Sequence, residues 1–225
     1  LPQIGVRGPR SKHLLDEAGC RGVVVAGDPG LAFHRGASPG PQAPRRTVAI
    51  NAGRAQGAVW GSEDRMIAVL ADAARRLAGA GYDVRFFPVW NRDRSVCDEV
   101  ARAAGLGSGA VDRLVADGEA GLRYLDAFDA VVTIKLHAAV LAAAAGAPFV
   151  AVAYQPKVRD FTASIGWERF TLRSDVVEAD DVVRAVRDIG ADQAALRARL
   201  DARVGETAQA LRAYAHRLEA WLLAA

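Results

Sequence analysis

The chain has 225 residues, of which 51% are hydrophobic and 24% are charged, and its formal net charge is +3. This composition is typical of a globular protein, and the mild positive charge argues against a nucleic-acid-binding surface. No stretch approaches the roughly 20 apolar residues of a membrane span, so we expect no transmembrane segment. Cys20 and Cys97 are too few for a disulfide framework and lack metal-ligand spacing, which predicts free, half-buried thiols, a reducing compartment and no metal site.

The first 44 residues are expected to stand apart from the rest of the chain. Their predicted elements are strands at 4–7 and 23–26 and a helix over 12–18. Ser11 is a suitable cap for that helix. Residues 37–44 are rich in Pro, Gly and Ser, which is typical of a linker. We therefore expect residues 1–44 to be a segment and linker left from a preceding domain, and residues 45–225 to form the main domain.

From residue 47 onward, apolar runs of strand length alternate with segments of helical periodicity. The expected strands are 47–51, 83–90, 111–115, 130–134, 149–153 and 170–172. The expected helices are 63–78, 94–104, 118–128, 136–145, 156–165, 180–189 and 191–224. This alternation predicts an α/β fold with a doubly wound parallel sheet flanked by helices. We interpret the apolar stripe of the last helix as core packing, the alternative being a dimer seam.

The segment 130–161 carries the strongest functional signal. It reads as strand, alanine-rich helix and strand, and its polar residues follow the two strands: Lys135 and His137 after the first, Tyr154 and Lys157 after the second. Ligands of open α/β sheets bind in the crevice outside the carboxyl ends of the strands. The pattern predicts a site for a small, highly charged anion.

Two further residues are candidates for the same rim, and each candidate has a simpler alternative. Asn51 opens a glycine-bearing loop between a strand and a helix, where it could present backbone N–H groups to an anion or merely reverse the chain. Arg7 follows the first strand and could equally be a solvated surface charge. His137 could instead cap its helix and bond to a backbone carbonyl, and Tyr154 could close the core.

The segment 130–161 also resembles the signature of the polysaccharide pyruvyl transferase family. That signature has Leu-His at a strand–helix junction, a small-residue helix, Gly-x-Pro, and a strand ending in Tyr-x-x-Lys. The matching residues are Leu136-His137, Gly146-Ala-Pro148 and Tyr154-Gln-Pro-Lys157. Upstream, Val6-Arg7, Ser11, Leu14-Leu15 and Gly27-Asp28-Pro29 match the family in the expected order.

The sequence departs from the family pattern at two positions. Lys135 stands where the family has an arginine before Leu-His, which keeps the charge but loses bidentate recognition of a carboxylate or phosphate. Gly8 stands where the family's Val-Arg-Asp segment has its acid.

The resemblance implies a Rossmann-like domain that is the C-terminal half of a GT-B-like architecture, with the site completed by a missing N-terminal domain or in a homo-oligomer. It implies transfer of a pyruvyl group from phosphoenolpyruvate to two hydroxyls of a sugar, forming a ketal and releasing phosphate. The acceptor would be a lipid-linked or polymeric glycan of an exopolysaccharide or cell wall. No further cofactor is implied, and the expected location is cytoplasmic, or peripheral at the inner face of the membrane.

The resemblance also implies roles for individual residues. His137 would bind the donor phosphate or act as the general acid. The implied substrate-binding residues are Arg7, Asn51, Lys135, Leu136, Tyr154 and Lys157. Because a fold does not fix a function, two alternatives remain: a GT-B-type glycosyltransferase that uses a nucleotide sugar, and a non-catalytic module that binds an anion or a glycan.

Overall fold

The centre of the protein is a sheet of five parallel strands. The computed structural model describes residues 3–34, 36, 45–54, 60–113 and 118–224. The strands are β3 (Thr47–Ile50), β4 (Asp83–Phe86), β5 (Ala130–Thr133), β6 (Phe149–Ala153) and β7 (Thr171–Arg173). Their order across the sheet is β4-β3-β5-β6-β7, and every neighbouring pair is parallel. The predicted parallel α/β sheet is confirmed.

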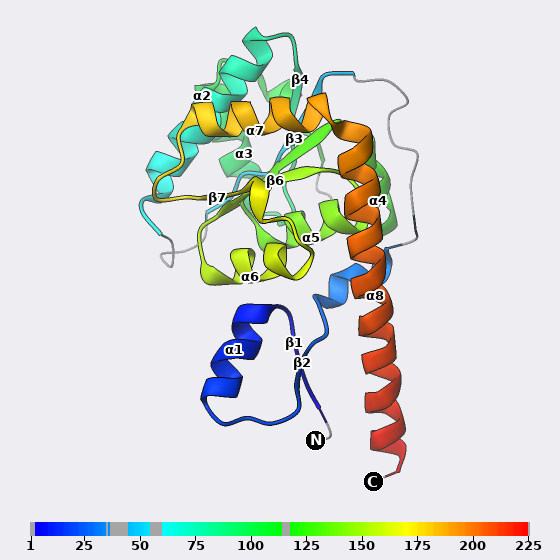
Figure 1. The fold of residues 1–225 in the computed structure, drawn as a ribbon. Helices are drawn as coiled ribbons and strands as arrows, with labels where there is room; N and C mark the ends of the chain where they lie inside the picture. The colour runs from blue at the N-terminus through cyan, green and yellow to red at the C-terminus, as the bar shows by residue number, and fades with distance from the viewer. Residues whose placement is uncertain (1–2, 35, 37–44, 55–59, 114–117, 225) are drawn as a thin grey trace.

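Helices cover both faces of this sheet (Figure 1). They are α2 (Glu63–Gly79), α3 (Asp93–Ala103), α4 (Gly118–Asp126), α5 (Leu136–Ala144), α6 (Pro156–Ser164) and α7 (Ala179–Ala191). The chain winds from β3 to β4, then passes back beyond β3 to β5, β6 and β7, so right-handed crossovers put α2 on one face and α5 and α6 on the other. The winding direction changes between β3 and β5. Ligands of open α/β sheets bind beside such a switch point.

The unit β5-α5-β6 is the most deeply buried part of the sheet. Every residue of β5 and β6 is buried, which explains why both read as continuous apolar runs. In α5 the alanines allow close packing on the strands, and seven of its nine residues are buried. His137 is exposed on this helix. A polar exposed residue on so apolar a helix needs an explanation outside the core.

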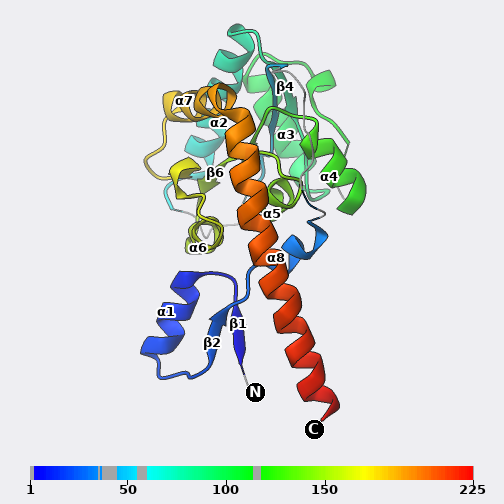
Figure 2. The same ribbon diagram turned by 45° about the vertical axis from the view of Figure 1, so that its right-hand side comes forward.

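A smaller unit lies beside this domain. Its strands β1 (Ile4–Val6) and β2 (Val23–Val25) are parallel, with α1 (Pro9–Glu17) between them, and the 3-10 helix η1 (Pro29–Phe33) follows. The last helix, α8 (Gln193–Leu223), starts on the main domain and continues past it along this unit (Figure 2). The hydroxyl of Tyr214 on α8 accepts a hydrogen bond of 3.0 Å from the backbone N–H of Gly5.

The interpretation of the α8 stripe as core packing holds only for its first half. Leu196, Leu200 and Val204 are buried in the core, whereas Leu222 is 61% exposed. The reason is length, because 31 residues of helix span about 46 Å and α8 continues past the main domain (Figure 2).

Three expected elements differ from the structure. The strand expected at 83–90 ends at Phe86, because Pro88 has no N–H to donate to a neighbouring strand. In the region 111–115, Val111 forms only an isolated bridge to Phe86, and residues 114–115 lie outside the described residues. The expected linker at 37–44 is not one of these three differences, because it lies outside the described residues.

The third difference is the start of α1, which begins at Pro9 rather than after Ser11. Its N-terminal N–H groups are satisfied from another helix: the carboxylate of Asp160 on α6 accepts hydrogen bonds from Arg10 N at 2.7 Å and Ser11 N at 3.2 Å. This contact fixes the small unit to the main domain. Sequence spacing alone does not reveal it, because the two partners are 150 residues apart.

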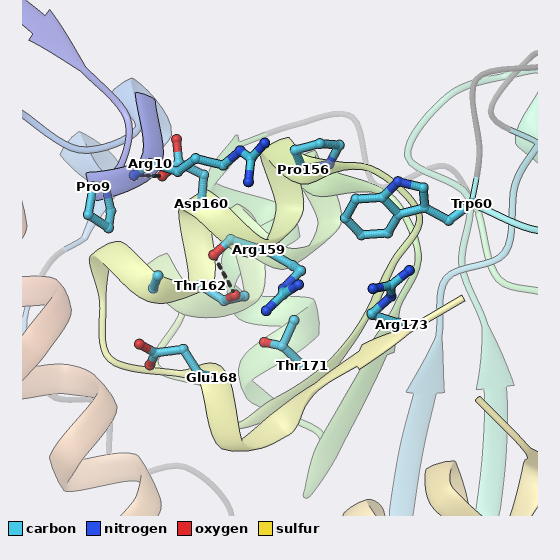
Figure 3. Close-up of a pocket in the computed structure, with 11 residues that line it drawn as sticks. Pro9, Arg10, Trp60, Pro156, Arg159, Asp160, Thr162, Glu168, Thr171 and Arg173 are labelled. Carbon is cyan, nitrogen blue, oxygen red and sulfur yellow. Dashed lines mark hydrogen bonds between the residues drawn. The ribbon is translucent and has the colours of Figure 1, made fainter. Parts of the chain in front are cut away.

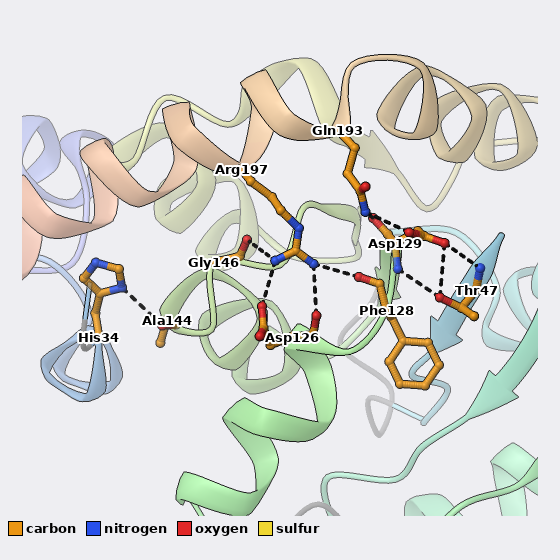
Figure 4. A network of polar contacts seen from close by, with 9 residues as sticks. All are labelled: His34, Thr47, Asp126, Phe128, Asp129, Ala144, Gly146, Gln193 and Arg197. Atoms are coloured by element: carbon orange, nitrogen blue, oxygen red, sulfur yellow. Dashed lines mark hydrogen bonds and ion pairs between the residues drawn. The ribbon is translucent and has the colours of Figure 1, made fainter. Parts of the chain in front are cut away.

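Arg197 anchors α8 to the main domain (Figure 4). Its side chain is only 9% exposed and pairs with Asp126 at 2.7 Å. The same guanidinium donates to the carbonyls of Asp126 at 3.1 Å, Phe128 at 2.9 Å and Gly146 at 3.3 Å. One planar group therefore satisfies the ends of α4 and α5 together.

The substitution Arg197→Lys is expected to lower the free energy of unfolding by about 1–3 kcal/mol, because a single ammonium cannot reach all three carbonyls and a buried unpaired acceptor costs that amount. Arg199→Lys is the matched control on the same helix, since Arg199 makes one exposed hydrogen bond to Gly166 O. Urea denaturation of both variants provides the measurement. Equal losses for the two would contradict the anchoring role.

Candidate functional site

Asn51 joins the strand ends at the switch point. It follows β3 and is fully buried. Its side-chain Nδ2 donates to Phe87 O at 3.0 Å, after β4, and its Oδ1 accepts from Lys135 N at 3.1 Å, after β5. The amide therefore ties three neighbouring strand ends together, and the structure places Asn51 beneath the edge of the sheet.

Lys135 points inward and forms a buried ion pair. Its Nζ lies 3.4 Å from Asp93 Oδ1, and the two side chains are 9% and 1% exposed. The Nζ also donates to Arg54 O. A Cβ on Gly53 would collide with Lys135 and with the Asp93 carboxylate, so only glycine fits over the pair. The Asp93 carboxylate therefore largely neutralises the positive charge of Lys135, which the sequence placed at the rim.

The second oxygen of Asp93 has no hydrogen-bond partner among the described residues. Burial raises the pKa of the Asp93 carboxyl, and the nearby Lys135 ammonium acts against that rise. Removing either Lys135 or Asp93 is therefore expected to lower the stability of the fold, because the other charge would stay buried without its partner. Asp93 was not predicted as a site residue, although its position three residues beyond a predicted strand end was a signal that could have found it.

His137 is the exposed residue at this edge. It is the second residue of α5, after the buried Leu136. Its ring contacts Trp90 edge-on, with 5.7 Å between ring centroids, and Trp90 is itself 46% exposed. Among the described residues no backbone carbonyl bonds to the imidazole, so the capping alternative has no support. The His137 side chain is exposed at this edge of the sheet.

Lys157 has the equivalent place on the neighbouring helix. It is the exposed second residue of α6, after Pro156, and its Nζ lies 5.3 Å from the ring centroid of Tyr154. Tyr154 is buried at the end of β6, and its carbonyl accepts from Trp60 N at 2.9 Å. Because β5 and β6 are parallel neighbours, α5 and α6 start at the same edge, where free N–H groups favour bound anions.

Arg7 lies just after β1 in the small unit. Its Nε lies 2.6 Å from Asp28 Oδ2, and Asp28 also caps η1 through Gly30 N at 3.0 Å. A Cβ on Gly30 would lie 2.6 Å from Val140 Cγ1, so η1 packs closely on α5. Val140 is one turn after His137 and lies on the same side of the helix. No hydrogen bond or ion pair joins Arg7 to the other predicted site residues within the described ranges.

The departure at Gly8 has a physical reason. A Cβ at this position would collide with the backbone and the carboxylate of Asp160. The space that a longer residue would need is filled by the group that caps α1. An aspartate at position 8 would also place a second negative charge against Asp160.

Other kinds of chemistry have little support in the described residues. They contain no group of three or more His, Cys, Asp or Glu placed to hold a metal ion. None of the described helices combines the length and apolarity needed to cross a membrane. Both cysteines are free; Cys20 is half-buried, whereas Cys97 is fully buried and burial raises its pKa to about 12.

Two comparisons bear on this arrangement. The sequence model of the polysaccharide pyruvyl transferase family matches residues 1–156 and therefore includes Arg7, Asn51, Lys135 and His137 but stops just before Lys157. A solved structure titled "Crystal Structure Analysis of the Glycotransferase of kitacinnamycin" is similar with a TM-score of 0.51 and 16% identity, covering 94% of this chain and 53% of that one. No curated protein matches the sequence.

At this identity the structural likeness shows the fold alone. It agrees with the parallel sheet described above and with a Rossmann-like domain of the kind found in one half of a GT-B-like architecture. The chain spans about half of the length of that solved structure.

Proposed function

Because the chain belongs to the polysaccharide pyruvyl transferase family, we propose that it transfers a pyruvyl group from phosphoenolpyruvate to a sugar of an exopolysaccharide or cell-wall glycan. The observation that carries this proposal is the position of His137. It is an exposed imidazole on the first turn of α5, next to the switch point and within the family match. The core does not require a histidine there.

The chemistry needs an acid and a cradle for two anionic groups. A proton adds to the methylene carbon of phosphoenolpyruvate, and a sugar hydroxyl adds to the adjacent carbon. The bond from that carbon to the phosphate oxygen then breaks, and the second hydroxyl completes the ketal. Of the two hydroxyl protons released, one balances the proton consumed and the other leaves with phosphate. In this proposal His137 either donates the proton or binds the phosphate.

The remaining predicted residues would either contact the donor or hold the strand ends. Lys157 is exposed at the start of α6 and would contact the donor directly. Within the described residues Arg7 donates only its Nε proton, to Asp28, so its other N–H groups remain available to a carboxylate of the donor. Asn51 and Lys135 would act from below by holding the strand ends. Leu136 and Tyr154 would shape the surface from which His137 and Lys157 project.

The proposal includes a second Rossmann-like domain, or a second copy of the chain, that completes the site. The small unit supports this, because parallel sheets are normally covered on both faces, whereas Leu14 on α1 is 51% exposed and Val25 on β2 is 36% exposed. The acceptor would be a lipid-linked or polymeric glycan. The location would be cytoplasmic, or peripheral at the inner face of the membrane, with no cofactor beyond the donor.

A ligand titration tests the donor. Phosphoenolpyruvate is expected to raise the thermal unfolding temperature, because binding to the folded state at 100 times Kd adds about 2.7 kcal/mol of stability. Uridine diphosphate at the same concentration is expected to have no effect. Protection by uridine diphosphate without protection by phosphoenolpyruvate would contradict the proposal and favour a nucleotide-sugar glycosyltransferase.

A further inference from the structure

A cavity of about 460 Å³ opens beside the predicted site, between α1, α6 and β7 (Figure 3). Of the cations that follow β6 in the sequence, Arg159 lines this cavity, whereas Lys157 does not. Its walls carry the side chains of Arg10, Trp60, Arg159, Glu168, Thr171 and Arg173. Its volume is in the range of ligand clefts, about 300–1,000 Å³, and exceeds what a molecule as small as phosphoenolpyruvate would fill.

The charge of this cavity favours an anion. Within the described part of the chain, the exposed guanidinium groups of Arg10 and Arg159 form no ion pair. Asp160, one of the two acids in the lining, is buried and already accepts from Arg10 N and Ser11 N, so it forms no ion pair with these arginines. Arginine side chains match carboxylate and phosphate groups with two parallel hydrogen bonds. The guanidinium group of either arginine is therefore free to recognise an anionic group of a ligand.

The cavity also has an aromatic wall. Trp60 is packed against the core, and the guanidinium of Arg173 lies 5.0 Å from its ring centroid. Its backbone is held by the bond from Trp60 N to Tyr154 O and by the bond from Ser174 Oγ to Trp60 O at 2.7 Å. Figure 3 shows the indole across the cavity from Arg159. A fixed indole presents a flat apolar surface, against which the C–H face of a pyranose ring can pack.

Polar acceptors complete the lining. The Glu168 carboxylate is exposed, and the half-buried Thr171 donates its Oγ1 proton to Trp167 O at 3.0 Å, which leaves the Oγ1 lone pairs free to accept. These groups suit the hydroxyls of a sugar. A simple inorganic anion would use the arginines but neither the indole nor the acceptors.

We propose that this cavity binds an anionic sugar unit of the acceptor glycan, with the pyranose ring against Trp60 and its carboxylate or phosphate at Arg159. The choice of a saccharide over other ring-bearing anions rests on the proposed function. Two kinds of ligand have this chemistry, a hexuronic acid and a sugar phosphate, since each combines a pyranose ring with one negatively charged group.

The test measures binding by isothermal titration calorimetry with methyl β-D-glucuronide, glucose 1-phosphate, methyl β-D-glucoside and inorganic phosphate. The two anionic sugars are expected to bind at least about tenfold more tightly than the neutral glucoside and than phosphate. The tighter of the two identifies the anionic group. Equal binding of glucoside and glucuronide, or phosphate binding as tightly as both sugars, would overturn the proposal.

The variant Arg159→Gln locates the site, because this exposed and unpaired side chain is not needed for folding. It is expected to weaken the anionic sugars about tenfold and to leave the neutral sugar unchanged. Arg169→Gln is the control, since Arg169 is an exposed arginine outside the cavity that pairs with Asp188 at 3.6 Å. An equal effect of both substitutions, or none for Arg159→Gln, would contradict the assignment.

Thermal protection by phosphoenolpyruvate separates this proposal from the proposed function. If phosphoenolpyruvate protects the chain but the anionic sugars do not bind, the cavity assignment fails alone. If the sugars bind through Arg159 and phosphoenolpyruvate gives no protection, the donor assignment fails. Tight binding of uridine monophosphate that depends on Trp60 would overturn the choice of a saccharide.

Discussion

Replacing His137 with alanine is expected to slow ketal formation by about 10²–10⁴-fold, the usual contribution of a positioned acid or base. The fold should persist, because the side chain is exposed and its described contact is the edge of the Trp90 ring. The rate is measured as phosphate release that depends on both phosphoenolpyruvate and the acceptor. The free energy of unfolding of the variant should stay close to that of the parent protein.

Two further variants show whether the loss is specific to His137 and which of its two proposed roles His137 has. His216→Ala removes an imidazole that is 82% exposed on α8 and should leave the rate unchanged. His137→Gln keeps a hydrogen-bond donor but cannot transfer a proton, so a fall in kcat with KM preserved assigns the acid role, whereas retained kcat with a raised KM assigns phosphate binding. Full activity in His137→Ala would remove His137 from the mechanism.

The substitution Lys135→Met is expected to lower the free energy of unfolding by about 3–5 kcal/mol near neutral pH. The methionine fills the space of the lysine stem but leaves the Asp93 carboxylate buried without its cation, and an uncompensated buried charge costs that much. Lys12→Met is the matched control, because Lys12 pairs with Asp16 on the surface of α1 and exposed pairs contribute about 0.2–1 kcal/mol. Urea denaturation compares the three proteins.

The cost of Lys135→Met should depend on pH in a defined direction. Burial already raises the pKa of Asp93, and loss of the lysine removes the charge that opposes this rise. A carboxyl with a raised pKa in the folded state favours folding below its unfolded pKa of about 3.9 and loses that contribution as the pH rises through the folded value. The variant should therefore recover stability, relative to the parent protein, between pH 7.5 and pH 4.5. Equal deficits at both pH values would contradict the buried pair.

The sequence predicts those parts of the fold that rest on local pattern. The apolar runs of β5 and β6 and the alanine-rich helix between them define the unit β5-α5-β6, and the order of polar residues after each strand places His137 and Lys157 at one edge. Ser62, a typical N-cap residue, caps α2 by accepting from Arg65 N at 3.4 Å. Each of these features depends on neighbours within a few residues.

The rest depends on contacts between distant residues. Lys135 reads as a rim cation, but Asp93, which is 42 positions earlier in the chain, draws it beneath the edge. Asp160 caps α1 across 150 residues, and this also explains the glycine at position 8. The apolar stripe of α8 has one pattern throughout, yet half of it meets the core and half lies beside the small unit. A linear pattern does not encode which partner a side chain meets.

The most direct test of the central claim is a titration of the His137 ring signals in the nuclear magnetic resonance spectrum of histidine-labelled protein. The chain has four histidines, and the spectrum of His137→Gln identifies the relevant signals. Phosphoenolpyruvate is predicted to shift the His137 signals in a saturable way, while uridine diphosphate leaves them unchanged. Saturable shifts with uridine diphosphate, or no shift with phosphoenolpyruvate in the folded protein, would contradict a phosphoenolpyruvate site at this edge of the sheet.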